Sequence, residues 1–449
     1  MLPVEVLQYT VYETGVLGPK DVLAFALTSK AMYGAVFGVL GQEDEFDRTQ
    51  HRALAGVLFC AQKGWWRAVL LAIKRGYGEV GLREQKTRRV PLCRKYAHTL
   101  LSLACRAGAV RVAEAALKKG VEPMGFDFVL ACGAGVVEVV QLLFADGRVD
   151  ADAENNGGIC LAAQNGHADV VRLLMGDERV DPAARRNEPI RLAAKSGHAE
   201  VLQLFLGDDR VDPAVSENFA IRIAAENGHT EAVRLLMEDE RVNPAAKGNT
   251  PIRLAAERGH ADVVRVLMGH DRVDLNHAIC VAAEKGQTEV VQLLLHDGRS
   301  DPGANDSRAI HKAALFGHTE IVRLLLDDAR TNPAAMDDYA IRIAAHYGRT
   351  EVIRPLLALD AVNPAANDNE AIRMAAWKGY VDIVQLLLDD HRVNPGARND
   401  DAILKAARNG HAAVVQLLLE DHRVDPTAKQ VAKAELQALS FLQPRTRRR

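Results

Sequence analysis

The chain has 449 residues, of which 26% are charged and 48% are apolar, so its composition is that of a folded protein and argues against extensive disorder. The formal net charge is −3, from 56 basic and 59 acidic residues, which argues against a nucleic-acid-binding protein because such proteins carry a positive excess. Six cysteines do not make a disulfide framework. The N-terminus has no basic signal-peptide region and no uninterrupted apolar span. We therefore expect an intracellular protein, cytoplasmic or nuclear, that contacts neither nucleic acid nor membrane.

Residues 1–40 differ from the rest of the chain and predict two or three short helices. Val4, Leu7 and Val11 give the first helix an apolar face. Pro19 suits the first turn of another helix, because proline lacks the N–H that is unpaired there. This segment resembles the F-box, whose motif is matched by Leu2-Pro3-Val4-Glu5-Val6-Leu7, Leu17, Pro19, Asp21-Val22-Leu23 and Thr28-Ser29-Lys30.

The F-box resemblance implies that residues 1–40 dock on the Skp adaptor of a cullin–RING ubiquitin ligase. The segment departs from the family in that Tyr33 stands near a position where many members have Trp, and in that the motif begins at Met1. The alternative is a helical cap that covers the apolar end of the array that follows. The resemblance assigns adaptor binding to Leu2, Pro3, Leu7, Leu17, Pro19, Val22 and Leu23.

A linker at residues 41–53 leads into an internal repeat that occupies residues 54–424. Each copy has a glycine that follows an Ala-rich apolar run and precedes a second apolar run. Weaker copies around Gly64 and Gly108 bring the prediction to about twelve helix pairs, with an insertion at 77–98. Eight of the nine intervals between the regular glycines are 31 residues and one is 27. These glycines are Gly135, Gly166, Gly197, Gly228, Gly259, Gly286, Gly317, Gly348, Gly379 and Gly410.

The copy around Gly228 shows why each unit predicts two short helices. Gly228 is expected to end the first helix, since only glycine takes the left-handed conformation there without strain. Thr230 is expected to cap the second helix, and Asn243-Pro244 to end the unit as a turn. Neither helix is long enough to be stable alone, so neighbouring units must stack and bury their apolar faces in a solenoid.

This repeat resembles the ankyrin repeat. The family's T-P-L-H-x-A-A signature reads TPIRLAA at 250–256, and its G-H-x-E-V-V reads GHTEIV at 317–322. The unit is slightly shorter than the usual length of about 33 residues. The resemblance implies an all-α solenoid whose concave face, formed by finger turns and first helices, binds proteins. Over 425–449 the pattern breaks, and we predict a capping helix at 431–442 followed by a basic tail.

Motifs for catalysis are not found. The sequence has no G-x-S-x-G, P-loop or H-E-x-x-H, so we expect no enzymatic activity, no cofactor and no metal. A histidine follows six of the repeat glycines, but stacked helices lie roughly 8–10 Å apart, too far for successive histidines to share one ion. We interpret these histidines, and the cysteines in the small apolar positions of the repeat, as structural.

Two rows of arginine recur with the repeat. In the first row, an arginine usually follows an aspartate by two residues, and we expect the two to pair within one loop. The second row is expected to link neighbouring repeats and consists of Arg191, Arg222, Arg253, Arg342 and Arg373.

The surface expected to bind a target is defined by the two residues before each repeat glycine. They are polar or charged in five successive repeats and then become apolar and aromatic. We expect Phe316, Tyr347 and Trp377 to occupy equivalent positions and to form one row with roughly 10 Å spacing. The alternative is that the rings pack between repeats. The candidate target-binding residues are Leu315, Phe316, Tyr339, Tyr347, Trp377 and Lys378.

Taken with the two resemblances, these patterns favour a substrate receptor of an SCF-type ubiquitin ligase. The segment 1–40 would bind the Skp adaptor, and the repeat array would hold an unidentified protein target within reach of the ubiquitin-loaded enzyme. The receptor would be a monomer within that complex. The alternative is an ankyrin binding scaffold or inhibitor with a helical cap and no role in ubiquitin transfer.

Overall fold

The computed structural model describes residues 100–118 and 120–442. Within these residues every regular element is an α-helix, which confirms the all-α prediction for the repeats they contain. The predictions for residues 1–40, the linker 41–53, the copy around Gly64, the insertion 77–98 and the tail after residue 442 lie outside the described residues. The seven residues assigned to adaptor binding lie outside them as well.

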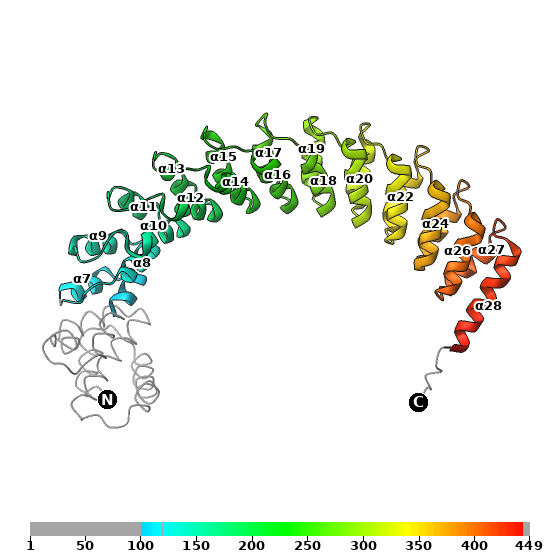
Figure 1. Cartoon of the computed structure of the whole chain (residues 1–449), viewed down its shortest axis with the longest axis horizontal. Helices are drawn as coiled ribbons and strands as arrows, with labels where there is room; N and C mark the ends of the chain where they lie inside the picture. The colour runs from blue at the N-terminus through cyan, green and yellow to red at the C-terminus, as the bar shows by residue number, and fades with distance from the viewer. Residues whose placement is uncertain (1–99, 119, 443–449) are drawn as a thin grey trace, which may run out of the picture. The chain divides into compact units, whose positions relative to one another are not determined.

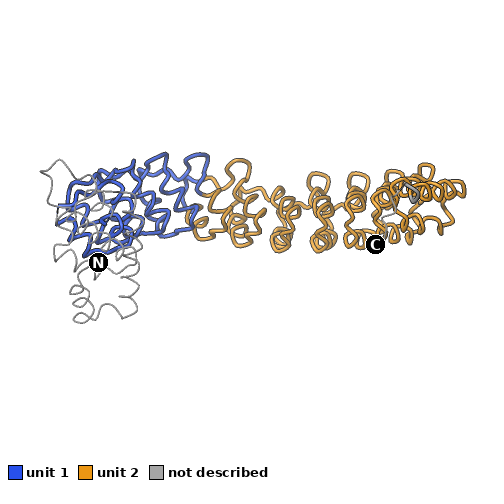
Figure 2. The backbone as a smooth tube through the Cα atoms, turned by 90° about the horizontal axis from the view of Figure 1, so that it is seen from below, with its two compact units in different colours: residues 1–220, 238–242 blue, residues 221–237, 243–449 orange. Residues whose placement is uncertain are grey.

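The chain divides into two compact units (Figure 2), residues 1–220 with 238–242 and residues 221–237 with 243–449. The division falls in the repeat that contains α14 (Val215–Glu226) and α15 (Thr230–Glu238). In unit 1 a helix over 100–106 precedes α7 (Val110–Lys118), α8 (Gly125–Ala134), α9 (Val137–Asp146), α10 (Ala153–Asn165), α11 (Ala168–Met175), α12 (Ala184–Ser196) and α13 (Ala199–Leu206).

Unit 2 continues the same alternation of a first and a second helix. Its helices are α16 (Ala246–Arg258), α17 (Ala261–Met268), α18 (Asn276–Lys285), α19 (Thr288–Asp297), α20 (Ala304–Phe316), α21 (Thr319–Asp327), α22 (Ala335–His346), α23 (Thr350–Leu357), α24 (Ala366–Lys378), α25 (Val381–Leu388), α26 (Ala397–Arg408), α27 (Ala412–Glu420) and α28 (Pro426–Leu442).

Within unit 2 the first helices of successive repeats pack on one another, and so do the second helices, which makes two layers (Figure 1). The contact between the layers is apolar, since Ile341 and Ala344 of α22 and Ile353 of α23 are fully buried. Alanines on the first helices present little bulk, so neighbouring helices can approach closely. Each short helix is therefore stabilised by its neighbours rather than by its own length.

The repeat glycines end the first helices as predicted. Gly317, for example, has φ +85° in the left-handed region and follows Phe316, the last residue of α20. The prediction for Thr230 is wrong in register, because Thr230 is the first residue of α15 and not its cap. In the equivalent helices α17 and α21 the cap position is held by His260 and His318, whose rings serve another purpose described below.

Most first helices contain, near their N-terminal end, a three-residue left-handed turn, which is the main feature that the sequence did not predict. In the repeat of Gly379, Asn367, Asp368 and Asn369 have φ between 49° and 60°. This region costs most side chains roughly 1–2 kcal/mol per residue, and Asn and Asp tolerate it best. The equivalent turns are 154–156, 185–187, 216–218, 247–249, 305–307, 336–338 and 398–400.

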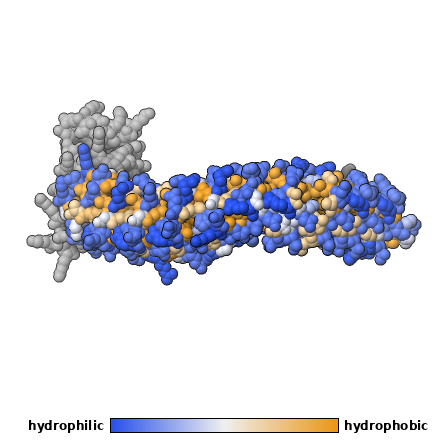
Figure 3. Space-filling view, turned by 90° about the horizontal axis from the view of Figure 1, so that it is seen from above, coloured by the Kyte–Doolittle hydropathy of each residue, from blue (hydrophilic) through white to orange (hydrophobic). Residues whose placement is uncertain are grey.

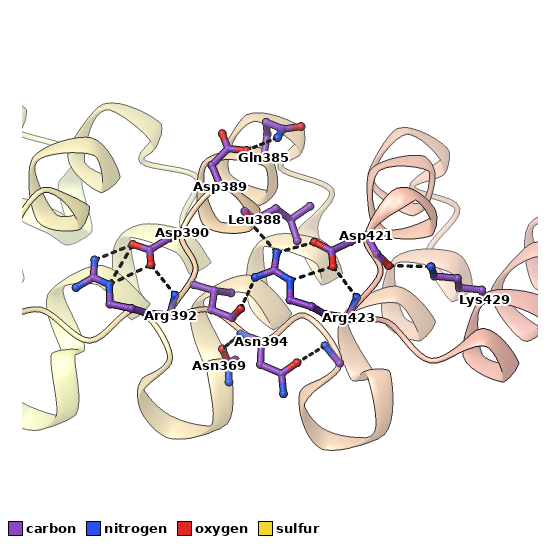
Figure 4. Close-up of polar contacts among 12 residues, drawn as sticks. Asn369, Gln385, Leu388, Asp389, Asp390, Arg392, Asn394, Asp421, Arg423 and Lys429 are labelled. Carbon is purple, nitrogen blue, oxygen red and sulfur yellow. Dashed lines mark hydrogen bonds and ion pairs between the residues drawn. The ribbon is translucent and has the colours of Figure 1, made fainter.

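The last residue of this turn is held by the next repeat. The side-chain oxygen of Asn369 accepts a hydrogen bond of 2.6 Å from the backbone N–H of Asn394 (Figure 4). The Asn394 side chain in turn accepts from the N–H of Gly396 at 3.0 Å, which forms the turn predicted for the Asx-Pro pair. The repeat of Gly286 lacks four residues of the finger, yet Asn276 still accepts from the N–H of Asp301 at 2.7 Å.

Two predictions about individual helices can be compared with the structure. A helix follows the last repeat, but α28 begins at Pro426 rather than at residue 431, because proline suits the first helical position. It packs on α26 with Ala432 fully buried. Pro355 lies inside α23, which nevertheless has the same eight-residue length as α25.

Candidate protein-binding surface

Five of the six histidines that follow a repeat glycine join two repeats through a ring hydrogen bond. Nε2 of His318 donates to the carbonyl oxygen of Glu284 at 3.1 Å, a residue 34 positions earlier. The ring also lies on the preceding repeat glycine, where a Cβ on Gly286 would come within 2.7 Å of it. The same bond is made by His167, His198, His260 and His411. The structural interpretation of these histidines is thus confirmed, and their partner is the backbone of the neighbouring repeat.

The loop arginines pair with aspartate as predicted. They also donate to backbone carbonyl oxygens of the preceding repeat, and we call this combination of contacts the loop clip. Arg392 donates to Asp390 through two nitrogens at 3.0 and 2.7 Å (Figure 4). It also donates to the carbonyl oxygens of Val362 and Leu357 of the preceding repeat, at 2.8 and 3.0 Å. The Arg392 guanidinium, by hydrogen bonding to the Asp390 carboxyl, lowers the pKa of that carboxyl. Arg210, Arg241, Arg299, Arg330 and Arg423 make the same double contact.

The second arginine row links neighbouring first helices in part of the array. Arg373 of α24 pairs with Asp401 of α26 at 3.0 Å, and Arg342 of α22 pairs with Glu370 of α24. Arg191 and Arg253 have no acidic partner of this kind within the described residues, and their Nε atoms are buried without a hydrogen bond. The prediction is confirmed as an ion pair for Arg342 and Arg373, and Arg191 reaches the next repeat through the Phe219 ring, whose centroid lies 5.5 Å from its guanidinium carbon.

The candidate target-binding residues come together on α20, α22 and α24, which are neighbours in the first-helix layer. Phe316 and Tyr347 are 43% and 48% exposed. Leu315, Tyr339 and Trp377 are half-buried, and Lys378 is exposed. Tyr339 meets His311 of the preceding repeat edge-on, with ring centroids 5.1 Å apart, and His346 lies 6.2 Å from the Trp377 ring.

The expected single row of Phe316, Tyr347 and Trp377 needs a correction in register. Phe316 and Tyr347 immediately precede their glycines, whereas Trp377 is two residues before Gly379 and is equivalent to His346. Lys378 takes the position in line with Phe316 and Tyr347, and its Nζ lies over the Trp377 ring at 4.1 Å. Trp377 thus packs partly between repeats, while Phe316 and Tyr347 face solvent.

Met336 is an additional exposed apolar residue that the sequence argument missed. It is 57% exposed in the finger turn of the Gly348 repeat, and its carbonyl oxygen accepts from Arg342 at 3.0 Å. The equivalent finger position carries Asn305 and Asn367 in the adjacent repeats. Reading that position across the repeats would have identified it. We define the aromatic surface as Leu315, Phe316, Met336, Tyr339, Tyr347 and Trp377.

Over the described residues, the second-helix layer shows no local change from polar to aromatic residues like the one that defines the aromatic surface. Seen from the side of the second helices, apolar colour lies between charged margins (Figure 3). An apolar side chain, leucine or methionine in most repeats, stands nine residues after every regular repeat glycine, as at Leu326, and leucine stands seven residues after most of them, as at Leu324 and Leu386. A feature shared by all repeats cannot select one binding site, whereas the aromatic surface belongs to three neighbouring repeats of unit 2.

Burial disfavours ionisation of the buried thiols. Burial raises the pKa of Cys160 to about 12, with a smaller contribution from Glu188, and burial likewise raises the pKa of Cys105 to about 12. A thiol must ionise to act as a nucleophile or metal ligand. Within the described part of the chain, no group of His, Cys, Asp or Glu side chains is placed to hold a metal ion. Nor does any helix described there have the length and apolarity to cross a membrane.

The repeat geometry has a counterpart among known protein families. The family model for ankyrin repeats in three copies matches residues 128–217, 190–279, 279–368 and 341–430, which together cover more than half of the chain. The chain belongs to the ankyrin-repeat family. Ankyrin repeats form protein–protein interaction modules and are typically scaffolds without enzymatic activity. No curated protein matches this ankyrin chain.

Proposed function

We propose that the aromatic surface is where this interaction module binds its protein target. The observation that carries the proposal is the exposure of Phe316 and Tyr347 at a position that is polar in the preceding repeats. Exposed aromatic side chains on a rigid support are typical of binding hot spots, since they bury much apolar area and lose little rotamer freedom. Met336 enlarges the same surface.

We further propose that the target is presented for ubiquitin transfer. This finer proposal rests on the F-box-like residues between Leu2 and Lys30, which lie outside the described residues. In this proposal the protein is a cytoplasmic or nuclear receptor, bound as a monomer to a Skp adaptor, and it contributes proximity rather than chemistry. The second candidate is a scaffold or inhibitor that binds the target alone.

Adaptor binding is tested on purified full-length chain with a purified Skp adaptor. Leu7→Asp places a charge on the apolar face of the first predicted helix, and an unpaired charge in an interface costs several kcal/mol. We expect the wild type to bind and Leu7→Asp to lose binding while keeping its helical circular dichroism spectrum. A wild type that binds no Skp adaptor would exclude the ligase role and favour the scaffold.

Target binding is tested by proximity labelling in cells, with each variant compared with wild type. Proteins labelled by wild type should be lost with Phe316→Ala and Tyr347→Ala, because truncating a central anchor commonly costs about 2 kcal/mol, or about 30-fold in affinity. Glu226→Ala, on the polar part of the same layer, should retain them. Trp377→Ala is a weaker probe because its ring also packs against His346. Equal losses for Tyr347→Ala and Glu226→Ala would refute the aromatic surface.

A further inference from the structure

Successive first helices of unit 2 meet through a regular pair of positions, which we call the cross-repeat row. The sixth residue before one repeat glycine faces the ninth residue before the next, as in Arg342 with Glu370 and Arg373 with Asp401. Earlier in the row His311 faces Tyr339. Where an arginine occupies the first position in the later repeats, an acid of the next repeat neutralises it.

Two positions of the row carry a cation that no acid neutralises. By the same register Arg253 of α16 corresponds to His277 of α18, and Arg308 of α20 corresponds to Cys280 of α18; the arginine charges act on these two groups. Nε of Arg253 has no hydrogen-bond partner, and Nη2 reaches only the Thr250 hydroxyl at 3.5 Å. Exposed Arg308 makes no hydrogen bond or ion pair within the described part of the chain. Because Nε of Arg253 is buried, the donors that remain for an external acceptor are Nη1 of Arg253 and the guanidinium of Arg308.

The two arginines are close enough to act on the same neighbour. The pKa of His277 is lowered first by burial and then by the charges of Arg253 and Arg308, against a smaller opposite effect of Asp274. Three acids on the flanking positions of this layer are already neutralised by cations of the next repeat, namely Glu226 by Arg258, Glu257 by Lys285 and Glu284 by Lys312. These three acids are therefore paired with other cations, and the positive charges of Arg253 and Arg308 have no acidic side chain within the described residues of this layer as an ion-pair partner.

This basic pair adjoins the aromatic surface. Arg308 and Phe316 belong to the same helix, α20, and eight residues of helix span about 12 Å. A peptide of a few residues in extended conformation bridges that distance. One partner segment can therefore contact both features.

We propose that Arg253 and Arg308 bind carboxylates of an acidic segment of the protein target, next to apolar side chains that occupy the aromatic surface. This inference rests on the proposed function and specifies the chemistry of the partner. Guanidinium groups match carboxylates in planar, two-bond geometry, which gives selectivity as well as attraction. A nucleic-acid strand fits less well, because the chain has a formal net charge of −3 and lacks the positive excess that a phosphate backbone requires.

The partner chemistry is tested with a displayed library of random peptides, about 12 residues long, selected on the full chain. We expect enrichment of peptides that combine Asp or Glu with aromatic or large apolar residues. Synthetic copies of the enriched peptides should bind about tenfold more weakly to Arg308→Glu, and binding should weaken as salt rises from about 50 to 300 mM. Arg265→Glu, an exposed arginine of α17 in the second-helix layer, is the matched control and should bind like wild type.

The outcomes separate this inference from the proposed function. Arg253→Gln supplies a second variant that introduces no negative charge and should also weaken the acidic peptides. If the selected peptides are neutral or basic, or if none is enriched, the acidic partner is excluded. Peptides that lose binding with Tyr347→Ala but not with Arg308→Glu would exclude it while leaving the aromatic surface in place. A single-stranded oligonucleotide that binds wild type and not Arg308→Glu would overturn the assignment in favour of nucleic acid.

Discussion

Removing the loop clip at Arg392 should weaken the coupling between two repeats of unit 2. The guanidinium donates to the carbonyl oxygens of Leu357, Leu359 and Val362 of the preceding repeat, at 3.0, 3.3 and 2.8 Å. Arg392→Ala removes all three bonds together with the ion pair to Asp390. In the variant the carboxyl of Asp390 still accepts the hydrogen bond from the backbone N–H of residue 392, which is 2.9 Å long in the wild type.

The size of the effect follows from how much water reaches the clip. Hydrogen bonds to charged groups contribute about 1.5–3 kcal/mol when buried, whereas exposed ion pairs contribute about 0–1 kcal/mol. The Arg392 side chain is 25% exposed, and water can replace it at the freed carbonyls. We therefore assign roughly 0.5–1 kcal/mol to each of the three bonds. Arg392→Ala should lower the free energy of unfolding by about 1.5–3 kcal/mol.

Arg272 provides a control at the same loop position. The residue two positions before it is His270 rather than an aspartate, and the backbone N–H of Arg272 donates to Nδ1 of His270 at 3.2 Å. The Arg272 side chain is exposed. Arg272→Ala should change the free energy of unfolding by less than about 0.5 kcal/mol. Arg392→Lys keeps the positive charge but lacks the planar guanidinium with its several N–H donors. It should therefore lose most of the unfolding free energy that Arg392→Ala loses.

Urea unfolding followed by circular dichroism measures these differences on the full chain. In a repeat array a weakened interface can split the transition, so hydrogen exchange should be recorded in parallel. Faster exchange in α23 and in residues 357–362 would locate the loss at the clipped repeat. If Arg392→Ala and Arg272→Ala shift the urea midpoint equally, the carbonyl bonds contribute nothing and the clip argument is wrong.

Three further predictions concern the repeats. Asn369→Ala should lower the free energy of unfolding in urea by about 1–3 kcal/mol, because the N–H of Asn394 loses its acceptor and alanine tolerates the left-handed turn poorly. Lys247→Ala, at an exposed residue of an equivalent turn, should lower the free energy of unfolding by less. Pro355→Leu restores the residue type of the equivalent helices and the missing backbone N–H, so amide exchange in α23 should slow toward that of α25; unchanged exchange would show that Pro355 imposes no weakness. The loop aspartates that pair with an arginine two residues later have pKa values lowered by those arginines, to about 2 at Asp177, so the unfolded chain binds more protons. Their contribution to stability is complete above the unfolded pKa near 4 and is lost as pH falls toward 2, and urea midpoints that stay level across this window would contradict the pairing.

The first-row arginines show where prediction from sequence ends. The spacing of Asp390 and Arg392 within one loop is local, so their pairing could be predicted from the sequence. The bond from Arg392 to Leu357, 35 residues earlier, depends on how far one repeat is rotated onto the next, and no local pattern carries that angle. The same holds for His318, whose position after a glycine was evident while its acceptor at Glu284 was not.

For the aromatic surface too, one part could be predicted from the sequence and another part depended on the tertiary structure. The sequence by itself determined that apolar residues replace polar ones before Gly317, Gly348 and Gly379, and that glycine ends each first helix. Only the tertiary structure decided that Phe316 and Tyr347 face solvent while Trp377 packs beside His346, because exposure depends on the neighbouring helix that each side chain meets. Periodicity specifies which residues lie on a helix face, and the stacking of repeats determines what covers that face.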